Sequence, residues 1–173
     1  MVEVVKTYHK SGELDEEFYV INGKKEDSFK KYYKNGQLYL ICSFINDKLN
    51  GEYKSYHENG CELSSDNSKR KNISSTDSFG QLWEICLYVD DQIDGEFKRY
   101  CSNGELYHSI MYSNGKANGE SKVYHDNEQV YSVCTYIDGM KNGYFKTYHS
   151  NGELWEISSF MNDKEIVKEN HIM

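Results

Sequence analysis

Histidines recur at one place along this sequence and could form a metal-binding column. His9, His57, His125 and His149 each follow a tyrosine and precede a short polar segment. Ligands of one zinc ion each lie about 2.1 Å from the metal, whereas equivalent residues of successive strand pairs would be about 9.5 Å apart. The spacing favours histidines that simply precede a turn, and we expect neither a metal nor a cofactor.

Cysteines also share a repeated position, at Cys42, Cys86 and Cys134. They are too far apart to bridge one another, and small buried hydrophobic residues are the expected role. Cys101 replaces a histidine of the column, and no acid–base pattern beside it predicts a nucleophile. Five cysteines in all, without a Cys-x-x-Cys pair, indicate neither a disulfide framework nor a zinc knuckle.

Glutamates follow a turn glycine at Glu13, Glu105 and Glu153. Acid–base catalysis needs two carboxylates in one asymmetric constellation, whereas this carboxylate is periodic and becomes Gln37 and Gln81 in other copies. The sequence contains no nucleophile elbow, P-loop or dinucleotide fingerprint either. We therefore predict a protein without catalytic residues, not an enzyme.

These residues recur because the chain is a tandem repeat with a step of 24 residues, shortened to 20 between residues 56 and 76. The motif Tyr-x-x-(Asn/Ser)-Gly-(Glu/Gln)-Leu starts, with variations, at residues 8, 32, 56, 100, 124 and 148, and a degraded copy starts at 76. Residues 64–78 contain a single apolar residue and read as an irregular loop; drift within a continuous sheet is the alternative. We expect about seven hairpins over 1–163 and a C-terminal cap or tail over 164–173.

Asn-Gly pairs predict where the chain turns. Asn35-Gly36 and its equivalents, between apolar-alternating runs, predict tight type I′ turns. A second marker fifteen residues later predicts a looser turn in each copy; it is found at Asn50-Gly51, Asp94-Gly95, Asn118-Gly119 and Asn142-Gly143. The predicted fold is all-β, an elongated single-layer antiparallel sheet of stacked β-hairpins.

With Asn35-Gly36 at the tip, Phe29 pairs with Cys42, Lys30 with Ile41 and Tyr32 with Tyr39. One face then carries opposed aromatic pairs, which are Tyr32 with Tyr39, Tyr100 with Tyr107, Tyr124 with Tyr131 and Tyr148 with Trp155. The other face carries Leu38, Phe29, Cys42 and Phe44. Both faces are partly apolar, so the pattern leaves open which one is covered.

One aromatic residue per copy is our candidate for partner binding. This aromatic strip consists of Tyr39, Trp83, Tyr107, Tyr131 and Trp155. Tyrosine and tryptophan are enriched at binding hot spots, and a regular sheet would present them as a continuous row. The alternative is structural, namely that the rings brace neighbouring hairpins.

The repeated unit resembles the MORN repeat, and more closely the variant found in the YwqK-type antitoxin family. The unit G-E-(Y/F)-K-x-Y-(H/C)-x-N-G-E-L-(Y/W) is clearest in residues 51–63, 95–107, 119–131 and 143–155. The resemblance implies stacked antiparallel hairpins that contact proteins and, in some members, lipids. Such arrays also occur in large DNA viruses of amoebae, and the asparagine-rich, proline-free composition fits that source.

Charge and hydropathy restrict the partners. A net charge of -8 argues against nucleic acid and against an anionic membrane. The sequence has no secretory signal pattern and no long apolar run, so we expect a cytoplasmic protein, in the host cytoplasm or the virion if it is viral. We predict a protein–protein interaction scaffold; an antitoxin-like inhibitor and a lipid-binding module are the alternatives.

The predicted sheet would have an exposed edge strand at each end. Such strands can pair with a second copy of the chain, so a homodimer is possible.

Overall fold

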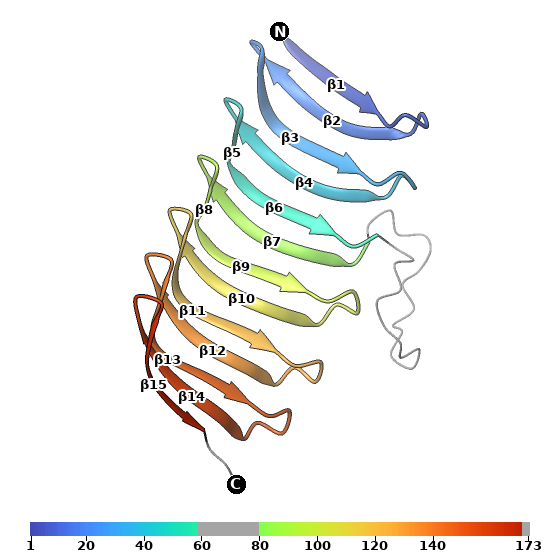
Figure 1. Cartoon of the computed structure of the whole chain (residues 1–173). Coiled ribbons are helices and arrows are strands. Elements are labelled where there is room, and N and C mark those ends of the chain that lie inside the picture. The colour runs from blue at the N-terminus through green and yellow to red at the C-terminus, as the bar shows by residue number, and fades with distance from the viewer. Residues whose placement is uncertain (59–79, 171–173) are drawn as a thin grey trace. The chain divides into compact units, whose positions relative to one another are not determined.

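A computed structural model describes residues 1–58 and 80–170, which form fifteen strands and no helix (Figure 1). The strands belong to one open antiparallel sheet in which neighbours follow chain order. The predicted all-β sheet of hairpin repeats is confirmed. The predicted loop at 64–78 and the C-terminal residues 171–173 lie outside the described residues. Within the described part, no helix is long and apolar enough to cross a membrane.

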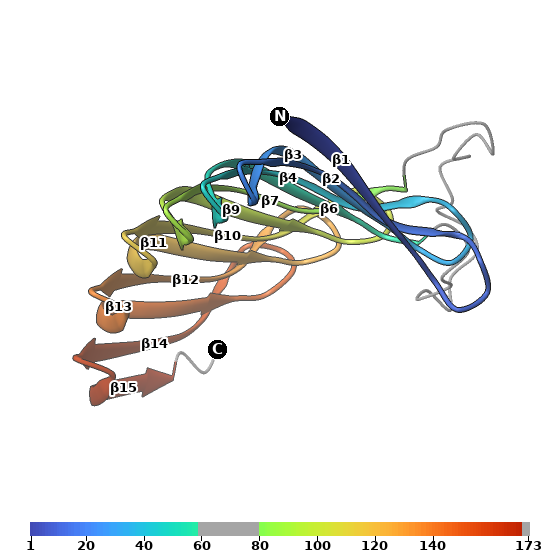
Figure 2. The same cartoon turned by 90° about the horizontal axis from the view of Figure 1, so that it is seen from above.

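The chain divides into two compact units, which are Met1–Gln92 with Tyr100–Gly104 and Ile93–Arg99 with Glu105–Met173. The first unit contains β1 (Val2–Tyr8), β2 (Leu14–Ile21), β3 (Lys24–Tyr32), β4 (Leu38–Ile45), β5 (Lys48–Leu49), β6 (Gly51–Tyr56) and β7 (Leu82–Val89). At the division lie β8 (Gln92–Ile93) and β9 (Gly95–Tyr100). The second unit continues with β10 (Leu106–Ser113), β11 (Lys116–Tyr124), β12 (Val130–Ile137), β13 (Met140–Tyr148), β14 (Leu154–Met161) and β15 (Lys164–Asn170). Figure 2 shows β11 to β15 following one another in chain order.

The two-residue turns are not at the predicted Asn-Gly pairs. A type I′ turn needs positive φ at both central residues, and Asn46 (52°) and Asp47 (68°) meet that requirement. The equivalent turns are Asn22-Gly23, Asp90-Asp91, Asn114-Gly115, Asp138-Gly139 and Asn162-Asp163. At Asn35-Gly36 only Gly36 has positive φ (80°), and the amide of Tyr33 donates to the carbonyl of Gln37 (2.8 Å). The type I′ prediction there is wrong, because this end of the hairpin is a five-residue loop.

The second set of glycines also lies outside turns. Gly119 (φ 127°) is inside β11, where the register with β10 shifts between Ile110 and Tyr112. Such a shift is a β-bulge, for which glycine supplies the left-handed backbone. A Cβ atom on Gly119 would lie 3.0 Å from the Cβ of Met111, so the position also lacks space for a side chain. The predicted looser turn at these glycines is wrong.

The observed register confirms part of the predicted pairing. Phe29 lies opposite Cys42 and Lys30 opposite Ile41, but a bulge between Lys31 and Tyr32 places Tyr32 opposite Leu38. The same bulge places Tyr124 opposite Val130 and Tyr148 opposite Leu154. The predicted opposition of Tyr32 with Tyr39, Tyr124 with Tyr131 and Tyr148 with Trp155 is therefore wrong. The bulge absorbs one residue, so the aromatic side chains are offset.

One face of the sheet is much better covered than the other. The covered face carries the buried apolar residues Phe29, Cys42, Cys86, Ile110 and Cys134, whereas buried Leu38 lies opposite Tyr32 beyond the bulge. Small polar side chains, among them Ser55, Ser121 and Ser132, are buried in the same face. The residues alternating with these in each strand form the open face, because successive side chains point to opposite sides. This observation decides the question that the hydrophobic pattern left open.

Aromatic rings cover the small residues of the covered face. In the first unit Phe29 contacts Phe18 and Phe44, with ring centroids 5.7 Å apart in both pairs. The ammonium of Lys25 lies 4.5 Å from the ring centroid of Phe18 and 4.9 Å from that of Phe29. In the second unit Lys141 lies 5.0 Å from the ring centroid of Phe145. Cation–π contacts thus occur in the covered face of both units.

Candidate partner-binding surface

The strip residues stand at the bulge of each hairpin, where the alternation of the two faces is interrupted. The contacts of this position are on the covered-face side, because its equivalent in the first repeat, Asp15, is 3.9 Å from Lys31, which shares a face with Phe29. In β12, exposed Tyr131 is the bulged residue between Val130, opposite Tyr124, and buried Ser132, opposite Val123. Trp155 has the equivalent place in β14. The exposed fractions are 45% for Tyr107, 37% for Tyr131 and 49% for Trp155, whereas Tyr39 and Trp83 are half-buried. The second unit therefore presents three strip rings to solvent.

Each strip ring that has a ring neighbour contacts a residue of its own hairpin loop. His149 stacks on Trp155 with centroids 5.5 Å apart, and His125 meets the edge of Tyr131 at 5.1 Å. In the first unit the partners are His57 with Trp83 (5.5 Å) and Tyr33 with Tyr39 (5.0 Å). These contacts restrict the rotation of the strip rings. They show that the rings brace their own loops, although in the second unit they stay exposed.

The loop histidines also connect successive repeats. The Nε2 of His125 donates to the carbonyl of Tyr148, one repeat further on, at 2.9 Å. His9 reaches Tyr32 (3.2 Å) and His57 reaches Tyr100 (3.1 Å) in the same way. The hydroxyl of Tyr33, which replaces histidine in its repeat, donates to the carbonyl of Tyr56 at 2.7 Å. The histidine column therefore links hairpins, a role that the sequence pattern did not indicate.

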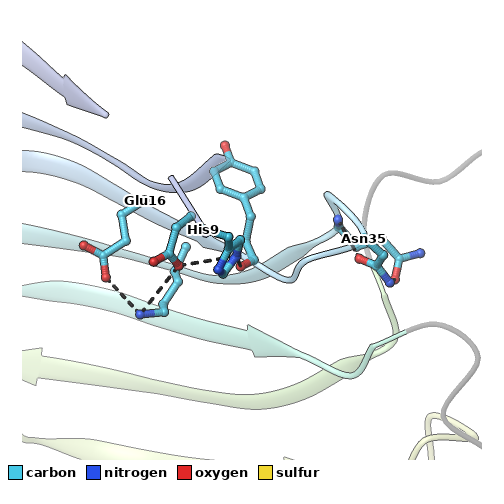
Figure 3. Close-up of polar contacts among 7 residues, drawn as sticks. His9, Glu16 and Asn35 are labelled. Atoms are coloured by element: carbon cyan, nitrogen blue, oxygen red, sulfur yellow. Dashed lines mark hydrogen bonds and ion pairs between the residues drawn. The ribbon is translucent and has the colours of Figure 1, made fainter. Parts of the chain in front are cut away.

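The first repeat has a charge where the later repeats have a strip ring. Asp15 lies 24 residues before Tyr39, and its Oδ1 is 3.6 Å from His9 Nε2 and 3.9 Å from Lys31 Nζ (Figure 3). Lys31 also forms an ion pair with Glu16 at 2.9 Å. A carboxylate thus replaces the ring against the loop histidine, and the strip begins at Tyr39.

Two shallow grooves hollow the second unit. The first, of about 330 Å³, is lined by Glu120, Lys122, Gln129, Val130, Val133, Tyr148 and Gly152. The second, also about 330 Å³, is lined by Tyr144, Ile157, Ser158, Ser159 and Val167. Aromatic and aliphatic side chains are thus accompanied by a few charges, a mixture that is common in binding sites.

A row of lysines lies on the open face of both units, and the sequence analysis did not predict it. Its members are Lys6, Lys30, Lys54, Lys98, Lys122 and Lys146, and the 24-residue step within each group of three was the available signal. Lys54 is paired with Glu52, Lys98 with Glu96 (2.8 Å) and Lys122 with Glu120, each glutamate standing two residues earlier in the same strand. Glu17 lies opposite both Lys6 and Lys30.

The cysteines of the covered face have no features of a nucleophile. Burial raises the pKa of Cys42 and of Cys86 to about 11, and it raises that of Cys134 as well. These thiols stay protonated near neutral pH, where only the thiolate is reactive. Among the described residues, no group of three or more histidine, cysteine, aspartate or glutamate side chains could hold a metal ion.

Four segments of the chain match the family model of the MORN repeat variant, namely residues 28–46, 49–60, 117–138 and 141–162. This chain contains MORN repeats. The MORN repeat is generally a motif of protein or membrane interaction, and its family is typically non-catalytic.

No curated protein matches this MORN-repeat chain. A structure of an S. aureus TarM mutant with fondaparinux, alpha-GlcNAc-glycerol and UDP has 7% identity and a TM-score of 0.31. A second TarM structure has 9% identity and a TM-score of 0.28. Each comparison covers 94% of this chain and 20% of TarM, so the chain spans about a fifth of that protein's length.

Proposed function

We propose that this MORN-repeat chain is a non-catalytic scaffold that binds a protein partner through the exposed aromatic strip of its second unit. Three exposed strip rings, Tyr107, Tyr131 and Trp155, support the proposal. Tyrosine and tryptophan contribute much of the energy of protein interfaces when they are buried by a partner. Rings already held by His125 and His149 lose little side-chain entropy on binding.

The test is partner capture from the native cell, followed by binding measurements on purified components. Replacing Tyr131 and Trp155 together by alanine removes two exposed rings and leaves the buried residues Ile110 and Cys134 unchanged. We expect the Kd for the captured protein to rise at least tenfold, about 1.4 kcal/mol, by calorimetry. Tyr8→Ala, which removes an exposed tyrosine outside the strip, is the matched control. An unchanged Kd in the double variant, with folding intact by circular dichroism, would show that the strip is structural only.

We propose, as a second candidate, an antitoxin-like inhibitor. Its support is the net charge of -8, because an acidic surface complements a basic active site and accelerates association with it. This candidate requires that the captured partner be an active enzyme or toxin whose activity falls when the chain is added. It also requires an association rate that decreases steeply with salt. A partner without activity, or an association rate insensitive to salt, would remove it.

A further inference from the structure

Lys146 differs from the other described lysines of the row in its neighbours: Lys6 and Lys30 lie opposite Glu17, and Lys54, Lys98 and Lys122 pair with a glutamate of their own strand. At the place of Glu52, Glu96 and Glu120, two residues before the lysine, this repeat has Tyr144. The residues opposite Lys146 in the neighbouring strands are Val133 and Ile157, both apolar. Among the residues that the structure describes, no carboxylate forms an ion pair with Lys146. Its ammonium lies 5.8 Å from the ring centroid of Tyr144.

The two grooves of the second unit meet at Lys146. Val133 and Tyr148 line the first groove, and Tyr144 and Ile157 line the second. Lys146 stands between Tyr144 and Tyr148 along β13 and between Val133 and Ile157 across the sheet. A partner that filled both grooves would therefore cover this ammonium. A cation covered without a counter-charge is costly, so the partner must supply an anion at this point.

We propose that Lys146 receives a carboxylate from the partner, within a segment that is otherwise apolar or aromatic. The inference rests on the proposed function and specifies the chemistry of the partner. The flanking side chains of the partner occupy the grooves beside Tyr148 and Tyr144, while its carboxylate meets the ammonium. Lys122 cannot make the same contact without losing Glu120, its partner in the same strand. A single lysine of the row thus sets the register of the bound segment.

The repeat itself supplies the most direct variant. Tyr144→Glu introduces the glutamate–lysine pair of three other repeats, so the sheet should tolerate it, and it neutralises the proposed anchor. Lys146→Met removes the charge and retains the apolar stem. Lys122→Met is the matched control, since its charge is already paired. Conversely, Glu120→Tyr leaves Lys122 unpaired and should create a second anchor.

The probe is an acetylated, amidated pentapeptide, Trp-Leu-Glu-Leu-Trp, titrated into the isotope-labelled full chain and followed by NMR. We expect shifts centred on Val133, Lys146 and Ile157. Replacing the peptide's glutamate by glutamine should weaken binding about fivefold, as should Tyr144→Glu or Lys146→Met, whereas Lys122→Met should leave it unchanged. Equal binding of both peptides, or shifts centred on Lys122, would overturn the inference. So would concentration-dependent shifts of the same residues without peptide, which indicate a second copy of the chain.

The captured partner separates this inference from the proposed function. If the Tyr131 and Trp155 double variant loses the partner while Tyr144→Glu binds it normally, the scaffold function stands and the Lys146 anchor is wrong. If neither variant changes the Kd of the partner, neither the strip nor the grooves of the second unit form the binding surface.

Discussion

Glu128 holds a backbone conformation that its side chain disfavours. Its φ of 65° matches the glycines at the same place in other loops, Gly36 (80°) and Gly152 (86°). A left-handed backbone costs a residue with a Cβ roughly 1–2 kcal/mol, although glycine loses more entropy on folding. We expect Glu128→Gly to raise the free energy of unfolding by about 0.5–1 kcal/mol in urea titrations.

The converse change is the control for Glu128. Gly152→Ala places a Cβ at φ 86°, where the nearest atom, Gln129 Oε1, is 3.8 Å from it, so strain acts without a clash. It should destabilise the chain by about 1 kcal/mol. A less stable Glu128→Gly variant would mean that the glutamate side chain makes a contact that outweighs the strain.

At the scale of the hairpin, the turn of one repeat is bonded to the strand before it. The Asp47 carboxylate accepts the amide of Lys25 at 2.6 Å, and the Asp47 amide donates to the carbonyl of Lys25 at 3.0 Å. Asp163 makes both bonds with Lys141, and Asp91 makes both with Leu49. Where glycine replaces the aspartate, as at Gly139, the backbone bond (to Ala117, 2.8 Å) is the one that remains.

Substitutions of Asp47 measure how much its hydrogen bond to the Lys25 amide contributes to the free energy of unfolding. Asp47→Gly preserves the positive φ and the backbone bond but removes the acceptor, so we expect a loss of about 1 kcal/mol in the free energy of unfolding. Asp47→Asn retains an oxygen acceptor and should stay within about 0.5 kcal/mol of the parent. Equal stability of the glycine variant and the parent in thermal unfolding would show that water replaces the carboxylate.

At the scale of the whole molecule, the sheet ends in strands with a single neighbour. Among the described strands, β1 pairs with β2 alone and β15 with β14 alone, and exposed Val4 and Ile166 lie on them. Edge strands leave backbone groups unpaired and open more easily than inner strands. We expect amide hydrogen exchange to be fastest in β1 and β15 and slowest in inner strands such as β3 and β12.

The same exchange experiment examines self-association. If β1 or β15 became protected as the protein concentration rose, the strand would be pairing with a second copy, as expected for a homodimer through sheet edges. Uniform protection at every concentration would contradict the predicted order of strand stability.

The sequence by itself determined the repeat, the all-β class and the alternation that places Val133 on one side of the sheet and Cys134 on the other. Periodicity suffices for these features because a strand's side chains alternate regularly. It also placed Phe29 opposite Cys42. It failed at the turns, because glycine after asparagine indicates a need for positive φ without distinguishing a loop or bulge from a hairpin tip.

Only the tertiary structure decided which face is covered and what surrounds each open-face residue. The burial of a sheet face depends on side chains from neighbouring strands, as in the contact of Phe29 with Phe44. The register between strands also changes at each bulge. The isolation of Lys146 has the same origin. Its missing glutamate is visible in the sequence, but the apolar residues opposite it, Val133 and Ile157, follow from the paired register of β12, β13 and β14.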